Sequence, residues 1–225
     1  MGLLDELKVQ ARSVAAQAAA PDAVTLDRNR RLAHGACRLA HDYWKEFAEQ
    51  LNVLRAPCPV RYQIDPRFVL EGLVCGDFRV TPQLQVHHSG EPRYDAVVLS
   101  WRATNGQSYR VDKELPRDVE RLRARLAHAG IPAHETPVRN VSTGRIQATC
   151  FEFSGAVSAS VRVVPLPDIG KVRLSFTNLD QLERVDADYP AAVLRQRLLD
   201  EIGRWIIGQP QRALEYAADI KRYAH

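Results

Sequence analysis

Three arginines recur at every fourth position of one short segment and form the sharpest cluster of positive charge in the sequence. Arg117, Arg121 and Arg125 lie within residues 116–129, which have a helical apolar face. A guanidinium group binds phosphate or carboxylate through two parallel hydrogen bonds. This stripe, together with Arg110, is therefore a candidate site for a phosphate group or an acidic partner.

The same charges also fit a plainer interpretation. Asp118 and Glu120 stand beside the arginines and would partly neutralise them, and exposed charge runs are usually solvated helix faces. Only five of the 31 basic residues are lysines, but GC-rich codon usage produces the same bias toward arginine. The sequence favours a solvated face over a binding stripe.

Residues that could hold a metal ion or act as a nucleophile form no recognisable pattern. The seven histidines make no H-E-x-x-H motif, and the four cysteines have no C-x-x-C spacing. Asp186 and Asp188 precede a predicted helix, so we interpret them as its N-terminal cap rather than as half of a metal site. A catalytic triad assembled by the fold would escape this search. We predict no catalytic residue, no metal site and no cofactor, which leans against an enzyme.

The composition is that of a globular protein. Hydrophobic residues make up 45% of the chain and charged residues 26%, and the net charge of +4 is small for a protein that coats nucleic acid. No run of about 18 apolar residues occurs, and Asp5 and Glu6 stand where a secretory signal needs positive charge. Cysteines without a pairing pattern suit a reducing compartment. We expect a cytoplasmic protein that binds no membrane.

Two amphipathic helices are predicted at the N-terminus, over residues 1–20 and 26–54. The apolar arc of the first includes Leu4, Leu7, Ala11 and Val14. The apolar seam of the second includes Tyr43, Trp44, Phe47 and Leu51. The second helix would be about 40 Å long and longer than the first, so a hairpin over residues 1–56 leaves part of the longer seam uncovered. We predict that these eight residues form a surface for another protein or for a second copy of the chain.

The middle of the chain, residues 57–187, alternates apolar and polar residues, which indicates antiparallel strands. Asn105-Gly106 is typical of a two-residue hairpin turn. Residues 116–129 predict a helix inserted between strands, because proline suits the first turn of a helix and glycine its end.

Residues 188–225 are predicted to form two helices, the first opened by Pro190 and the second running from Pro210 to about Tyr223. We therefore expect one α+β domain over residues 1–225. It would contain an antiparallel β-sheet of about 6–8 strands, an N-terminal helical hairpin, one mid-chain helix and two C-terminal helices.

Three functions from different classes remain open. The uncovered seam and the lack of catalytic motifs favour a non-enzymatic protein-interaction or assembly module, oligomeric through its long helix. The first alternative is a protein that binds a small apolar ligand between sheet and helices, in a pocket lined by Trp44, Trp101, Phe151, Trp205 and His88. The second is nucleic-acid binding through the arginine-lined helix, which is not favoured.

Overall fold

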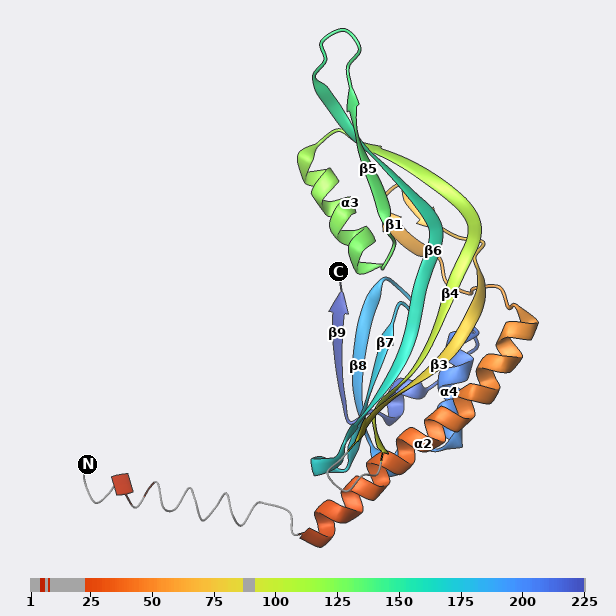
Figure 1. The fold of residues 1–225 in the computed structure, drawn as a ribbon, viewed down its shortest axis with the longest axis vertical. Helices are drawn as coiled ribbons and strands as arrows, with labels where there is room; N and C mark the ends of the chain where they lie inside the picture. The colour runs from red at the N-terminus through yellow and green to blue at the C-terminus, as the bar shows by residue number, and fades with distance from the viewer. Residues whose placement is uncertain (1–4, 7, 9–22, 87–91, 225) are drawn as a thin grey trace.

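The computed structural model describes residues 5, 6, 8, 23–86 and 92–224. Its largest element is a seven-stranded antiparallel sheet in the order β3-β4-β6-β7-β8-β9, with β5 also paired to β6 (Figure 1). The strands are β3 (Val74–Val86), β4 (Pro92–Lys113), β5 (Ala133–Arg139), β6 (Ile146–Leu166), β7 (Lys171–Thr177), β8 (Glu183–Pro190) and β9 (Asp219–Ala224). The predicted α+β class, the antiparallel pairing and the number of strands in this sheet are confirmed.

The sheet is organised around β6, which pairs with β4 along one edge and with two shorter strands along the other. Residues 146–153 of β6 pair with β5, and residues 160–166 pair with β7. Within the described residues, positions 154–159 have no strand partner on that second edge. The sheet therefore has a gap at this point, which shapes the candidate site.

The helices gather on one face of the sheet. Helix α2 (Ala23–Leu54) contacts β3, β4 and β6, and α4 (Gln196–Ile206) places Trp205 4.8 Å from the ring of Phe176 on β7. Strand residues pointing to this side are apolar and buried, as Leu99 and Trp101 of β4 show. The alternation predicted from the sequence follows directly from this one-sided cover, because successive strand residues point to opposite faces.

Helix α3 (Pro116–His128) and a two-stranded sheet of β1 (Tyr62–Asp65) and β2 (Phe68–Leu70) cover the upper part of the same face. Phe68 packs edge-on against Phe153 of β6, with ring centroids 5.6 Å apart. The ammonium of Lys113 lies 2.7 Å from the carboxylate of Asp65 and joins the small sheet to the end of β4. The inserted helix predicted for residues 116–129 is confirmed.

The predicted turn at Asn105-Gly106 is wrong. β4 runs through both residues, and its pairing with β6 only shifts register between Thr104 and Ser108. Gly106 has the positive φ of 70° that a turn would need, but here the local geometry forms an irregularity within one long strand. The amide of Asn105 donates to the hydroxyl of Tyr109 at 2.7 Å and holds the irregularity in place. β6 is long enough to pair on both sides of it, so continuous pairing replaces the hairpin.

The predicted C-terminal helices are only partly present. Residues 190–195 include a short 3₁₀ turn, η2 (Ala191–Val193), and α4 begins at Gln196. The segment from Pro210 to Tyr223 is not a helix: it forms a second 3₁₀ turn, η3 (Ala213–Tyr216), and then β9, which pairs with β8. The edge of β8 offers backbone hydrogen bonds to residues 219–224. Pairing with β8 therefore overrides the weak helical preference of this segment.

The first helix of the predicted N-terminal hairpin lies mostly outside the described residues, although Asp5, Glu6 and Lys8 within it are described and helical. The long helix predicted for residues 26–54 is confirmed as α2, with Ala33, Cys37, Ala40, Trp44 and Leu51 among its buried residues. None of the described helices is both long enough and apolar enough to cross a membrane.

The close approach of β4 and β6 at the irregularity makes a testable prediction. A Cβ added at Gly155 would lie 2.6 Å from Cε2 of Tyr109 and closer still to Oδ1 of Asn105, whereas one added at Gly76 meets nothing within 4 Å. Gly155→Ala should lower the free energy of unfolding by about 1–3 kcal/mol, because neither neighbour can move without losing contacts.

Gly76→Ala on β3 is the matched control and should change the free energy of unfolding by less than about 1 kcal/mol. Urea denaturation of both variants measures the difference. Equal stability of the two variants would contradict the predicted crowding between β4 and β6.

Candidate binding face of the sheet

The face of the sheet away from α2 and α4, here called the open face, carries polar residues at the positions between the buried ones. On β4 these positions are Val98, which is apolar, and the polar Ser100 and Arg102; they alternate with buried Leu99 and Trp101. Because the strand register is known, the open-face residues of neighbouring strands can be placed side by side. Their arrangement was not readable from the sequence, which does not give the strand order.

One row of register partners crosses the middle of the open face. It runs from Arg79 on β3 through Ser100, Ser160 and Thr177 to Arg184 on β8. Directly opposed residues of antiparallel strands lie about 4.5–5.5 Å apart. Ser100, Ser160 and Thr177 thus form a patch of small hydroxyl groups, here called the hydroxyl floor.

Further arginines flank the hydroxyl floor. Arg102 follows Ser100 two residues later on β4 and is opposite Ser158, and Arg162 follows Ser160 two residues later on β6 and is opposite Val98. Residues two apart on a strand point to the same face. The floor is thus bordered by guanidinium groups on β3, β4, β6 and β8.

The surface is hollowed over this floor. A hollow of about 580 Å³ is lined by the floor residues, by Arg79 and Arg102, by Asn178 and by residues 128–130 at the C-terminal end of α3. It lies beside the gap in the sheet, where the amide of Asn178 donates to the carbonyl of Ser158 at 2.9 Å in place of a strand. A second hollow of about 600 Å³ shares Arg79 and Arg102 and extends to the end of α2. The two adjoining hollows are called the trough below.

A distortion of β3 helps to form the trough. The pairing of β3 with β4 shifts between Gly76 and Arg79, and Asp77 has a φ of 57°. The ring of Phe78 turns inward and stacks on Trp101, with ring centroids 5.4 Å apart. The side-chain amide of Asn52 on α2 accepts a hydrogen bond from the backbone N–H of Phe78 (2.8 Å) and donates one to the backbone carbonyl of Phe78 (2.9 Å). Such bulges redirect side chains at the edges of sheets.

Unusual backbone conformations are concentrated at the same place. Of the residues that the structure describes, three non-glycine residues have a positive φ: Arg55, Asp77 and Asn178. Each of them lines the trough. Backbone in this region costs free energy and clusters at functional sites, so its presence here supports the trough as the candidate site.

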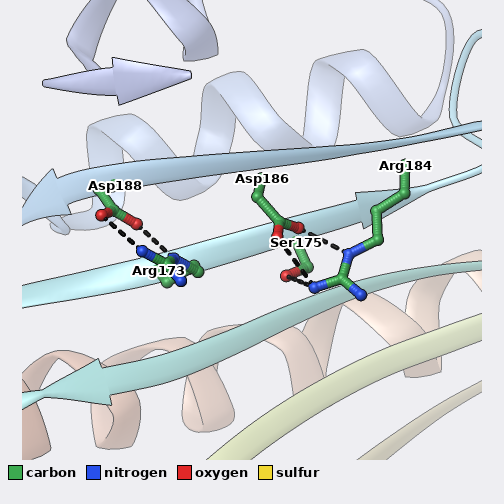
Figure 2. Close-up of polar contacts among 5 residues, drawn as sticks. All are labelled: Arg173, Ser175, Arg184, Asp186 and Asp188. Atoms are coloured by element: carbon green, nitrogen blue, oxygen red, sulfur yellow. Dashed lines mark hydrogen bonds and ion pairs between the residues drawn. The ribbon is translucent and has the colours of Figure 1, made fainter. Parts of the chain in front are cut away.

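Two arginines of the open face are already neutralised, as Figure 2 shows. Arg173 donates two hydrogen bonds to Asp188, at 2.6 and 2.9 Å. Arg184 donates two to Asp186, at 2.7 and 2.9 Å, and a further one of 3.3 Å to the hydroxyl of Ser175. Hydrogen bonding to Arg173 is the largest favourable cause that lowers the pKa of Asp188.

The remaining arginines of the open face have no such partner. Within the described part of the chain, no hydrogen bond or ion pair engages the side chains of Arg79, Arg102 and Arg162. Arg79 and Arg102 line the trough, and Asp77 is the acidic residue that lines it with them; Arg162 lies beside the hydroxyl floor. The trough therefore has an excess of positive charge and hydroxyl donors, a combination suited to a carboxylate or phosphate group.

The arginine stripe predicted on residues 116–129 lies on α3, apart from the trough lining. Arg117 and Arg121 both lie within 4 Å of Asp118, at 3.8 and 3.7 Å, and Arg125 is half-buried. Arg110 lies 3.6 Å from Asp112 and 4.0 Å from Glu152. The structure thus does not bring these four arginines together with the three unpaired ones.

The predicted partner-binding residues of α2 face the interior. Trp44 is 0% exposed and Leu51 is buried, while Tyr43 and Phe47 are half-buried. The hydroxyl of Tyr43 donates to Asp200 of α4 at 2.8 Å. The sheet and α4 therefore cover this part of the seam, and Leu4, Leu7, Ala11 and Val14 lie outside the described residues.

The residues predicted to line an apolar pocket are scattered through the core. Trp44 and Phe151 are 0% exposed. Trp101 contributes to the wall of the trough, Trp205 lines a separate surface hollow near Gly208, and His88 lies outside the described residues. The structure does not bring these side chains together into one site.

The interpretation of Asp186 and Asp188 as a helix cap is wrong. Both lie in β8, where they make the ion pairs of Figure 2, and α4 starts eight residues after Asp188. Among the described residues, no three His, Cys, Asp or Glu side chains are grouped so as to hold a metal ion.

Sequence reasoning missed Arg79, Arg162 and the hydroxyl floor. The signal was present in the alternation of β4 and β6, where polar residues lie between the buried ones. It marks which residues share a face, but only the strand order shows which of them are neighbours.

No protein family model, curated protein or solved structure matches this chain.

The ion pair of Arg173 and Asp188 predicts a contribution to acid stability. The lowered pKa of Asp188 means that its charge stabilises the fold above the ordinary carboxyl pKa of about 3.9, and that this stabilisation is lost as the pH falls through the lower pKa of the folded state. Asp188→Asn should lower the free energy of unfolding at pH 7 by about 1–2 kcal/mol, since the partner guanidinium is itself partly exposed.

As the pH falls from 5 to 3, the free energy of unfolding of this variant should decrease less than that of wild type, because the variant has no ion pair to lose. The remaining pH dependence comes from Asp65 and Glu135, whose pKa values are also lowered in the fold. Urea denaturation across this pH range measures both effects, with exposed Asp168→Asn as control. An unchanged acid dependence in Asp188→Asn would contradict the assignment.

Proposed function

We propose that this protein is a protein-interaction module that binds its partner through the open face of the sheet, with the trough receiving an acidic segment of that partner. The observation that carries the proposal is the set of three unpaired guanidinium groups, Arg79, Arg102 and Arg162, around the hydroxyl floor. Arginine binds carboxylates bidentately, and the ion pairs of β7 and β8 use that same geometry within the chain.

The shape of the trough supports an extended occupant. Its two hollows share Asp77, Arg79 and Arg102 and together run from the middle of the sheet, across β3, to Asn52 and Arg55 at the end of α2. A peptide segment can follow such a long, shallow surface, whereas a small ligand usually occupies a deeper and more enclosed pocket.

The sequence led us to expect an interaction surface on α2. Because the sheet and α4 cover the apolar seam of α2, we place the interaction surface on the other side of the sheet instead. Trp44 and Leu51 are buried within the chain, so a partner could reach them only by displacing the sheet. The described part of α2 therefore supports the interior of the protein, and the open face supplies the recognition surface.

Nucleic-acid binding is supported less well by the same residues. Non-specific binding to a duplex requires many phosphate contacts along a continuous basic surface. On α3, Asp118 lies near both Arg117 and Arg121, and on the sheet Arg173 and Arg184 are paired with aspartates. These acidic neighbours would repel phosphates beyond the trough.

The proposal predicts binding of an acidic peptide that depends on the trough arginines. Fluorescence anisotropy of a labelled decaglutamate peptide should show saturable binding, and Arg79→Gln or Arg102→Gln should each weaken it about tenfold or more, since a charged hydrogen-bonding partner contributes about 1.5–3 kcal/mol. Arg30→Gln, an exposed arginine on α2, makes the same charge change elsewhere and should alter the affinity less than twofold.

Three outcomes would overturn the proposal: no saturable binding at low ionic strength, equal weakening by Arg30→Gln, or tighter trough-dependent binding of a labelled single-stranded oligonucleotide than of the peptide. The first two would exclude the trough as an acidic-segment site. The third would make nucleic acid the better partner, because phosphate contacts would then exceed carboxylate contacts.

A further inference from the structure

Two of the four cysteines lie next to each other, although they are 17 positions apart in the sequence. Cys58 lies in the connection between α2 and β1, and Cys75 lies near the start of β3. The N–H of Cys58 donates to the carbonyl of Leu73 at 2.8 Å, and the N–H of Cys75 donates to the carbonyl of Ala56 at 2.9 Å. These bonds flank an antiparallel bridge between Pro57 and Val74.

This pairing places both cysteine side chains on the same side of the bridge. Residues 56 and 58 point to one side of an extended segment and residue 57 to the other, and the same holds for residues 73 and 75. The two thiols are neighbours on that side, close enough for each to shift the pKa of the other.

The two thiols differ in a way that suits an attacking and a resolving group. Cys58 is half-buried, whereas Cys75 is only 4% exposed. Hydrogen bonding to Cys75 lowers the pKa of Cys58 to about 7, and the reciprocal bond together with burial raises the pKa of Cys75. At neutral pH, Cys58 thus carries a substantial fraction of thiolate, the form that reacts with oxidants.

We propose that Cys58 and Cys75 form an oxidisable dithiol that a hydroperoxide converts to an intrachain disulfide. The Cys58 thiolate attacks one oxygen of hydrogen peroxide, the O–O bond breaks and hydroxide leaves, which takes up a proton to become water; this gives a sulfenic acid. The Cys75 thiol then attacks the Cys58 sulfur, the S–O bond breaks and a second water leaves. In sum, two thiols lose two hydrogens and one peroxide is reduced to two waters.

The other two cysteines are placed differently and serve as controls within the chain. Cys37 on α2 is 0% exposed, and burial raises its pKa to about 12. Cys150 on β6 is 2% exposed, and burial is also the largest cause that raises its pKa. Both are poor nucleophiles at neutral pH and should remain thiols.

The disulfide would join the connection after α2 to the strand that carries the bulge at Asp77. Cys75 itself lines the trough together with Arg79. The oxidation chemistry does not depend on the proposed binding function, and each can fail without the other.

The test uses the full chain in reduced form, treated with an equimolar amount of hydrogen peroxide, blocked with iodoacetamide and digested with trypsin without reductant. Mass spectrometry should find the tryptic peptides of Cys58 and Cys75 linked, at a mass lower by two hydrogens than their sum. The initial rate of formation should rise about tenfold per pH unit below pH 7 and level off above it, following the Cys58 thiolate.

Variants separate the roles of the two thiols. Cys75→Ser should leave a sulfenic acid on Cys58 that dimedone labels, and Cys58→Ser should give neither product, with oxidation at least about tenfold slower. Cys37→Ser and Cys150→Ser should form the same linked peptides as wild type. Three results would overturn the proposal: no linked peptides from wild type, a link between two chains, or oxidation of Cys58→Ser at the wild-type rate. The wild-type result is decisive even if a variant fails to fold.

Discussion

The structure depends on the packing of one apolar seam of α2 against one face of the antiparallel sheet. Trp44 of that seam is fully buried, and α2 contacts both the sheet and α4. A single long helix covers the inner face of β3, β4 and β6, and α3, α4 and the small β1–β2 sheet extend the cover. Because helical cover lies on one side only, the strands in the middle of the sheet alternate apolar and polar residues, and the polar ones are directed to the other side.

The open face is the consequence of this constraint. Its polar side chains are not merely solvated: Asp186 and Ser175 are buried beneath their neighbours although they lie on the open face. Removing a carboxylate from water is costly unless it is paired, and the bidentate bonds of Arg184 to Asp186 and of Arg173 to Asp188 offset that cost. The second pair also joins β7 to β8. Toward β3, Arg79 and Arg102 are exposed and have no such partner among the described residues, so their guanidinium groups are available to the acidic segment that we propose.

Local patterns predicted the elements whose stability is local or strongly periodic. The seam of α2 and the apolar face of α3 repeat over several turns, and both helices were correctly predicted. Asn105-Gly106 failed as a turn because β6 pairs with β4 on both sides of it, and Asp186 failed as a cap because β7 and β9 enclose its strand. In each case a long-range partner decided the outcome, and strand order, which sets the neighbours of Arg79 and Arg162, is equally long-range.

The central claim is that the open face, and not a helix, recognises the partner. It is tested most directly by nuclear magnetic resonance of ¹⁵N-labelled protein titrated with decaglutamate. The account predicts that shifts concentrate on the backbone amides and guanidinium Nε–H groups around Arg79, Ser100, Arg102 and Ser160, with the outer surface of α2 unaffected. Shifts centred on Arg117 and Arg121 of α3, or spread along α2, would contradict it.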